Sequence, residues 1–147
     1  DIPVYVDPKK ENFFAYKGVR LFKPNRSEFE SALSGENDYK DFKNSGTELR
    51  KKLGTEILMV TQGERGISLF SDQGMHTIGT KARKVHDVSG AGDTAISAFV
   101  LADLAGATIE EAAQISNYAA GRVCEEVGVV PITLEMLDEI VEHYNDH

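Results

Sequence analysis

Short apolar runs that stop at proline or glycine alternate with helix-patterned segments, and this alternation most constrains the fold. Val4 to Asp7 ends at Pro8, and Val19 to Lys23 ends at Pro24, so both runs are predicted to be buried strands. Glu56 to Thr61 is a third such run. Strands that alternate with helices predict an α/β fold, with a mostly parallel sheet covered by helices on both faces.

The predicted helices differ between the two halves of the chain. In the first half, apolar residues recur at helical spacing among charged ones, which predicts two surface helices; these residues are Phe29, Leu33, Phe42, Leu49 and Leu53. A hairpin, Ile67 to Phe70 and Met75 to Ile78, follows the third strand. The second half is rich in Ala and Leu, and its predicted helices are Thr94 to Leu104, Thr108 to Glu126 and Thr133 to Tyr144. Thr108 and Glu111 form a capping-box pattern.

Composition narrows the class of protein. The chain has 147 residues, enough for one ordinary domain, and its net charge of −8 argues against a nucleic-acid or membrane surface, which needs clustered Lys and Arg. Cys124 is the single cysteine and is predicted to be a small buried hydrophobic residue. Without a basic and apolar leader pattern at the N-terminus, we expect a cytoplasmic protein.

The segment Asp87 to Thr94 joins a predicted strand to a predicted helix and carries the chemistry. Its small residues Gly90, Ala91 and Gly92 let backbone N–H groups approach a phosphate, and the helix adds its own unpaired N–H groups. Asp93 would repel a phosphate unless its carboxylate faces the other reactant, where it can accept the proton of an attacking hydroxyl. The pattern predicts phosphoryl transfer; the alternative is a tight turn in which Asp93 only stabilises the helix dipole.

The same string, Asp-Val-Ser-Gly-Ala-Gly-Asp-Thr, resembles the C-terminal signature of the ribokinase-like (PfkB) carbohydrate kinases. The resemblance implies that Asp93 is the catalytic base and that residues 90–92 form the anion hole. It also implies ATP and Mg²⁺ as cofactors, within the C-terminal part of a three-layer α/β/α fold.

Two further segments resemble motifs of this family in the expected order. Asn25 and Glu28 match an Asn-x-x-Glu element that organises Mg²⁺ and phosphates, although the same residues can simply cap a helix. The stretch from Thr61 to Gly66 matches a loop that lies against the nucleotide, although the motif taken alone is more typical of an ordinary hairpin turn. The nucleotide-contacting residues that the resemblance implies are Asn25, Glu28, Thr61, Gly63, Arg65, Gly66 and Asn117, the last near the adenine.

The resemblance also implies a monovalent cation such as K⁺, with Asp87 and Ser89 at the matching positions and carbonyls near residues 123–128. Ile132 stands where ribokinase has a serine, which leaves the potassium dependence open. Glu28, Asp87 and Ser89 are therefore the candidate metal-contacting side chains.

Within the family, residues 7–9, 21–30 and 85–94 look most like the heptose-7-phosphate kinase part of the HldE-like ADP-heptose synthesis proteins, which act in lipopolysaccharide core assembly. We expect residues 1–147 to be the ATP-binding C-terminal portion of such a kinase, without the N-terminal sugar-binding and lid portion. Alternatives are a nucleotide-binding fragment without catalysis and a ribokinase- or fructokinase-type enzyme. The expected ligands are ATP and a sugar phosphate, and the expected full-length protein is a homodimer.

Overall fold

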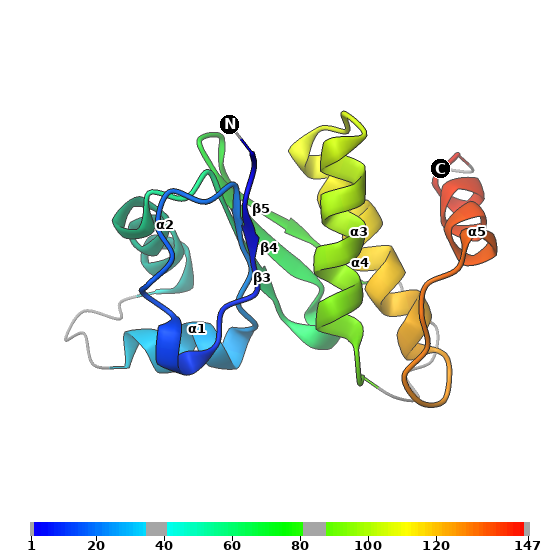
Figure 1. Cartoon of the computed structure of the whole chain (residues 1–147), viewed down its shortest axis with the longest axis horizontal. Helices are drawn as coiled ribbons and strands as arrows, with labels where there is room; N and C mark the ends of the chain where they lie inside the picture. Colours follow the sequence, from blue (N-terminus) through cyan, green and yellow to red (C-terminus); the bar gives the residue numbers. More distant parts are fainter. Residues whose placement is uncertain (1, 35–40, 81–87, 146–147) are drawn as a thin grey trace. The chain divides into compact units, whose positions relative to one another are not determined.

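The computed structural model describes residues 2–34, 41–80 and 88–145, and the chain divides into two compact units (Figure 1). The first comprises Asp1–Gln62 and Ile67–Thr77, and the second Gly63–Gly66 and Ile78–His147. Each unit is described by itself.

Among the described residues, five strands form one sheet in the order β1-β2-β3-β4-β5. Its strands are β1 (Tyr5–Val6), β2 (Leu21–Phe22), β3 (Ile57–Thr61), β4 (Ile67–Ser71) and β5 (Gly74–Ile78). The first three strands are parallel, with Val6 opposite Phe22 and Phe22 opposite Leu58. β4 runs antiparallel to β3. The predicted mostly parallel sheet with a hairpin is therefore confirmed.

β3 lies at the centre of the sheet and is buried on both faces. Residues 57–60 are all fully buried, which is the pattern of a parallel strand with both faces covered. One face forms the core of the first unit together with α1 (Arg26–Leu33), α2 (Phe42–Leu53) and Phe13, which directly follows the short 3₁₀ segment η1 (Lys10–Asn12). The buried residues of this core are Val6, Phe13, Val19, Phe22, Phe29, Leu33, Leu49, Leu53, Leu58, Val60 and Phe70.

In the part of the second unit that the structure describes there are three helices, α3 (Ala91–Leu104), α4 (Ile109–Cys124) and α5 (Leu134–Asn145), preceded in the chain by the 3₁₀ turn η2 (Gly63–Arg65). Small residues allow α3 and α4 to pack closely, and Ser116 on α4 donates a 2.6 Å hydrogen bond to the Ala95 carbonyl on α3. Ala98, Ala119 and Ile140 join the three helices in one buried cluster. Cys124 is buried, as predicted.

The start of α3 differs from the prediction. The helix begins at Ala91, three residues before the expected Thr94, with Gly90 as its N-cap in the left-handed region at φ +80°. Gly92 lies in the first turn of this helix, where the backbone N–H groups have no intrahelical acceptor. None of the helices in the described ranges combines the length and apolar composition needed to cross a membrane.

Candidate functional site

The first candidate segment is the N-terminus of α1. The Glu28 N–H donates to Asn25 Oδ1 at 2.8 Å, and the Asn25 N–H donates to Glu28 Oε2 at 2.8 Å, which makes a reciprocal capping box. The helix-capping interpretation of these two residues is therefore confirmed. A carboxylate has two oxygens and about four lone-pair positions, so capping through one oxygen is compatible with a second role for Glu28 toward a hydrated Mg²⁺.

The structure brings Asn25 and Thr61 together. The two residues form a parallel bridge just beyond β2 and at the end of β3, and the Thr61 N–H donates to the Pro24 carbonyl at 3.1 Å. They lie at the carboxyl edge of the parallel strands, where open α/β sheets bind ligands.

Sequence reasoning missed an ion pair of a buried lysine at this same edge. Lys23 follows β2 and is only 2% exposed, and its Nζ lies 3.4 Å from Oδ1 of Asp7, which follows β1. A lysine is almost never fully buried unless it is paired. The available signal was positional, because Asp7 and Lys23 each stand between a strand and a proline.

The segment from Thr61 to Gly66 connects β3 to the antiparallel β4, so it is a hairpin connection, as the alternative interpretation held. Gly63 to Arg65 form the 3₁₀ turn η2, and the Gly66 N–H donates to the Gly63 carbonyl at 2.9 Å. Gly66 has φ +85°, and a Cβ atom there would lie 1.9 Å from the Ile78 carbonyl oxygen, so only glycine fits. Arg65 is exposed, and its contact with a nucleotide remains a prediction.

In the second unit, the turn at the N-terminus of α3 has the geometry of an anion site. The Thr94 N–H donates to the Gly90 carbonyl at 2.9 Å, and the Ala91 N–H donates to the Val88 carbonyl at 3.3 Å. The N–H groups of Gly92 and Asp93 belong to the first turn, whose donors have no intrahelical acceptor. Such donors, at the positive end of the helix dipole, suit a phosphate.

The turn exposes two polar side chains, those of Ser89 and Asp93. Asp93 is exposed on the first turn of α3, so its carboxylate can meet a second reactant. A Cβ atom on Gly90 would lie 3.3 Å from Cγ1 of Val129, which places the loop after α4 against the turn. Ser89 is exposed, and Asp87 lies outside the described residues, so the cation site that pairs them remains a prediction.

Asn117 is 4% exposed on α4, and its Nδ2 donates a 2.9 Å hydrogen bond to the Gly79 carbonyl. Its side chain therefore fixes the segment that follows β5, a structural task that sequence reasoning did not foresee. A contact with adenine remains a prediction for this residue.

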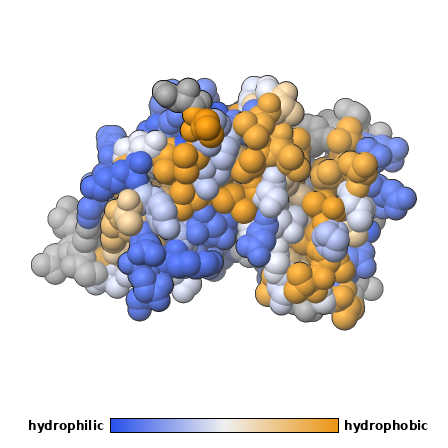
Figure 2. Space-filling model, viewed as in Figure 1, coloured by the Kyte–Doolittle hydropathy of each residue, from blue (hydrophilic) through white to orange (hydrophobic). Residues whose placement is uncertain are grey.

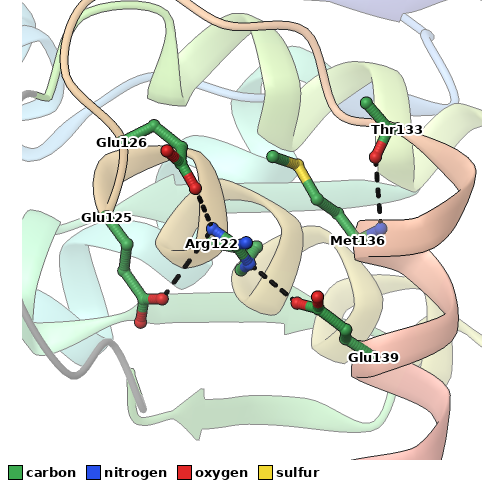
Figure 3. Close-up of polar contacts among 6 residues, drawn as sticks. All are labelled: Arg122, Glu125, Glu126, Thr133, Met136 and Glu139. Atoms are coloured by element: carbon green, nitrogen blue, oxygen red, sulfur yellow. Dashed lines mark hydrogen bonds and ion pairs between the residues drawn. The ribbon is translucent and has the colours of Figure 1, made fainter.

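Figure 3 shows how Arg122 holds the C-terminal end of α4 to α5. Its guanidinium donates to Glu126 Oε1 at 2.6 Å and to Glu139 Oε2 at 2.9 Å, and lies 3.9 Å from Glu125 Oε2. The hydrogen bonds to Glu126 and Glu139 raise the Arg122 pKa above its usual range. The cluster braces the start of the loop that carries Val129, and nothing in the sequence pattern had singled it out.

Among the described residues, no group of three or more His, Cys, Asp or Glu side chains could together hold a metal ion. Mg²⁺ usually keeps several waters and takes one or two protein carboxylates plus substrate phosphates. Glu28, a single carboxylate at the N-terminus of α1, fits that sparse mode.

Comparison with known proteins decides the family. The family model described as "pfkB family carbohydrate kinase" matches residues 1–135. The chain belongs to the PfkB family of carbohydrate kinases. It is 41% identical over 140 residues to the bifunctional protein HldE of Nitratiruptor sp., and the match covers 94% of this chain and 30% of that protein.

Solved structures show the same fold. Phosphofructokinase-2 from Escherichia coli, in complex with substrates and products, matches with a TM-score of 0.84 and 20% identity over 98% of this chain and 48% of its own. Arabidopsis thaliana ribokinase, complexed with ribose and ATP, matches with a TM-score of 0.77 and 23% identity over 96% of this chain and 48% of its own. The predicted ribokinase-like α/β fold is thus confirmed.

Proposed function

We propose that this chain is the ATP-binding, catalytic part of a sugar kinase that phosphorylates D-glycero-D-manno-heptose 7-phosphate in lipopolysaccharide-core precursor synthesis. The single observation that carries the proposal is the N-terminus of α3, where Gly90 caps the helix in the left-handed region and Asp93 is exposed on the first turn. The 41% identity to an HldE protein supports the choice of acceptor sugar.

The proposed reaction uses the turn and the acid in separate roles. The N–H donors of Gly92 and Asp93 stabilise the charge on the phosphoryl oxygens, and one preorganised donor of this kind is worth about 3 kcal/mol. Asp93 accepts the proton of the sugar hydroxyl as that oxygen bonds to the γ-phosphorus. The bond from phosphorus to the bridging oxygen breaks, and ADP leaves with the electron pair.

The remaining predicted contacts bind and orient the nucleotide. Bound Mg²⁺ would neutralise phosphate charge, and Glu28, with Asn25 beside it, would hold its water shell. Thr61, Gly63, Arg65, Gly66 and Asn117 are the other proposed nucleotide contacts. A monovalent cation near Ser89, cytoplasmic location and a homodimer of the full-length protein also remain proposals.

A second candidate is nucleotide binding without turnover by the chain alone. The chain spans 30% of its HldE relative and 48% of the phosphofructokinase-2 chain. Enzymes of this kind commonly need a closing element to exclude water and position the acceptor. A ribokinase- or fructokinase-type acceptor is the third possibility, which the choice of sugar in the assay separates.

Calorimetric titration of ATP with Mg²⁺, paired with a phosphoryl-transfer assay on heptose 7-phosphate and on ribose, tests the proposal. We expect Asp93→Ala to bind nucleotide as the parent chain does and to lose about 10² to 10⁴ of kcat, the usual contribution of a general base. The control is Asp103→Ala, which removes the same side chain from the other end of α3. The base assignment is wrong if Asp93→Ala turns over within a few-fold of the parent. Binding without turnover by the parent supports the second candidate, and a folded chain that binds no adenine nucleotide overturns both.

A further inference from the structure

Arg26, the first residue of α1, is held on three sides inside the first unit. Its Nε donates to Glu30 one turn along the helix, and its Nη1 donates to Gln62 Oε1 at 3.0 Å. Its Cζ lies 4.1 Å from the centroid of the Phe42 ring on α2. A guanidinium with these three partners has a fixed position and a charge that Glu30 already balances.

Gln62 links Arg26 to strand β4 of the sheet by hydrogen bonds. Its amide oxygen accepts from Arg26, and its Nε2 donates to Ser68 Oγ at 2.7 Å. Ser68 lies on β4 opposite Val60 and is only 1% exposed. Both ends of the Gln62 amide are therefore satisfied, and the hydrogen-bonded chain Glu30–Arg26–Gln62–Ser68 runs from the exposed side of α1 into the sheet.

This chain of bonds runs beside the residues that the proposed function assigns to the nucleotide. Arg26 directly follows Asn25, and Gln62 directly follows Thr61, while Asn25 and Thr61 form a bridge of their own. In the two family motifs, Arg26 and Gln62 stand at the unspecified positions. The contact between them joins segments 36 residues apart in the sequence.

We propose that Arg26 and Gln62 are positioning residues. Their hydrogen bond fixes the Asn25–Glu28 turn against the end of β3, so that both segments are already ordered when the nucleotide binds. This inference rests on the proposed function only for the identity of the ligand. The physical reason is that backbone at the carboxyl edge of a sheet must be ordered before binding, or the ordering cost reduces the affinity.

A double-mutant cycle separates positioning from direct contact. We expect Arg26→Met and Gln62→Met each to weaken binding of ATP·Mg²⁺ by about tenfold, equivalent to about 1.4 kcal/mol. The double variant should be no weaker than either single one, because both changes break the same bond. If the double variant is instead weakened by about the product of the two, the residues contact the nucleotide independently and the inference fails.

Arg20→Met is the matched control. Arg20 lies before β2, at the amino end of the strand, and its Nη1 forms a 2.6 Å ion pair with Glu56. Its side chain is 25% exposed, against 33% for Arg26, so the two substitutions remove comparable ion pairs at opposite ends of the strand. We expect Arg20→Met to leave nucleotide affinity within twofold of the parent. An equal loss in Arg20→Met would mean a general loss of structure and would overturn the inference.

Amide hydrogen exchange without nucleotide tests the positioning independently of the proposed function. The Thr61 N–H is bonded to the Pro24 carbonyl, and its exchange should speed up by several-fold in Arg26→Met and in Gln62→Met but not in Arg20→Met. Unchanged Thr61 exchange overturns the inference whatever the ligand. If exchange accelerates but the parent chain binds no nucleotide, the proposed function fails while the mechanical coupling stands. If the parent binds and Arg26→Met binds equally well, the function stands and the positioning role fails.

Discussion

Gly46 of α2 packs directly against the buried ring of Phe70 on β4. A Cβ atom at this position would lie 2.2 Å from the ring Cζ, and the ring is 1% exposed and in edge contact with Phe42. Alanine gains about 1 kcal/mol over glycine inside a helix, but overpacking a buried contact typically costs about 1–3 kcal/mol. Because the ring is buried and packed against Phe42, we expect Gly46→Ala to lower the free energy of unfolding by about 1 kcal/mol, measured by urea denaturation.

The same substitution in a Phe70→Leu background is the control. The shorter side chain leaves space for the new methyl group, so there Gly46→Ala should be neutral or stabilising through helix propensity alone. Equal destabilisation in both backgrounds would show that the cost does not come from the Phe70 contact.

At the residue scale, the sequence predicted what is local and missed what is distant. The Asn25–Glu28 and Thr108–Glu111 capping boxes were foreseen because their partners are three residues apart. The bonds from Arg26 to Gln62 and from Asn117 to Gly79 join residues 36 and 38 positions apart. No spacing rule reaches across such intervals, because only the tertiary fold brings these residues together.

At the scale of elements, strand and helix types were predicted well and one important boundary was not. Proline and glycine residues predicted where the strands end, and the alternation of strands with helices predicted a mostly parallel sheet. The predicted start of α3, Thr94, lies three residues after the observed start, because a glycine such as Gly92 is more typical of a loop than of a helix. The strand expected before Asp87 falls outside the described residues.

The N-terminus of α4 gives a prediction on pH. Glu111 Oε2 accepts from the Thr108 N–H at 2.8 Å and from the Thr108 hydroxyl at 2.9 Å, and these bonds, the backbone one first, lower the Glu111 pKa. A carboxyl whose pKa is lowered by folding stabilises the fold above its unfolded pKa, about 4.3 for Glu, and this contribution disappears as the pH falls through the folded value. Glu111→Gln should therefore have a lower Tm than the parent at neutral pH, and the difference should close in acid.

Glu110→Gln is the matched control for this measurement. Glu110 lies in the same first turn but outside the capping box, so its removal tests the general effect of an acid near the helix dipole. A Tm difference for Glu111→Gln that is the same at neutral and acid pH, or that matches the Glu110→Gln difference throughout, would contradict the assignment to the capping box.

At the scale of the whole molecule, apolar surface remains exposed in both units. In the second unit, orange surface gathers over α3, α4 and α5 in Figure 2. The large exposed residues there are Leu101, Leu104, Val127, Val129, Leu134 and Val141. In the first unit, Ile2 and Val4 are 89% and 51% exposed just before β1. Surfaces of this kind commonly mark contacts with other protein segments.

β1 adds a second property, because it is an edge of the sheet in the described part of the chain. Its inner side is paired with β2, and the Val4 carbonyl accepts from the Arg20 N–H at 2.9 Å. An edge strand beside exposed apolar side chains can pair with another chain, whereas a lysine at the edge discourages such pairing. We therefore expect the protein to associate as its concentration rises and Val4→Lys to reduce this association several-fold, as measured by sedimentation velocity.

The control for this last prediction is Val127→Lys, which makes the same change of charge at a valine that is 83% exposed in the loop after α4. Both variants move the net charge of −8 by one unit in the same direction, so a difference between them cannot come from overall repulsion. If association occurs through the β1 edge, only Val4→Lys suppresses it. If Val127→Lys is equally effective, the apolar surface of the helical unit makes the contact, and if neither variant changes the sedimentation of an associating parent, both surfaces are excluded as its main source.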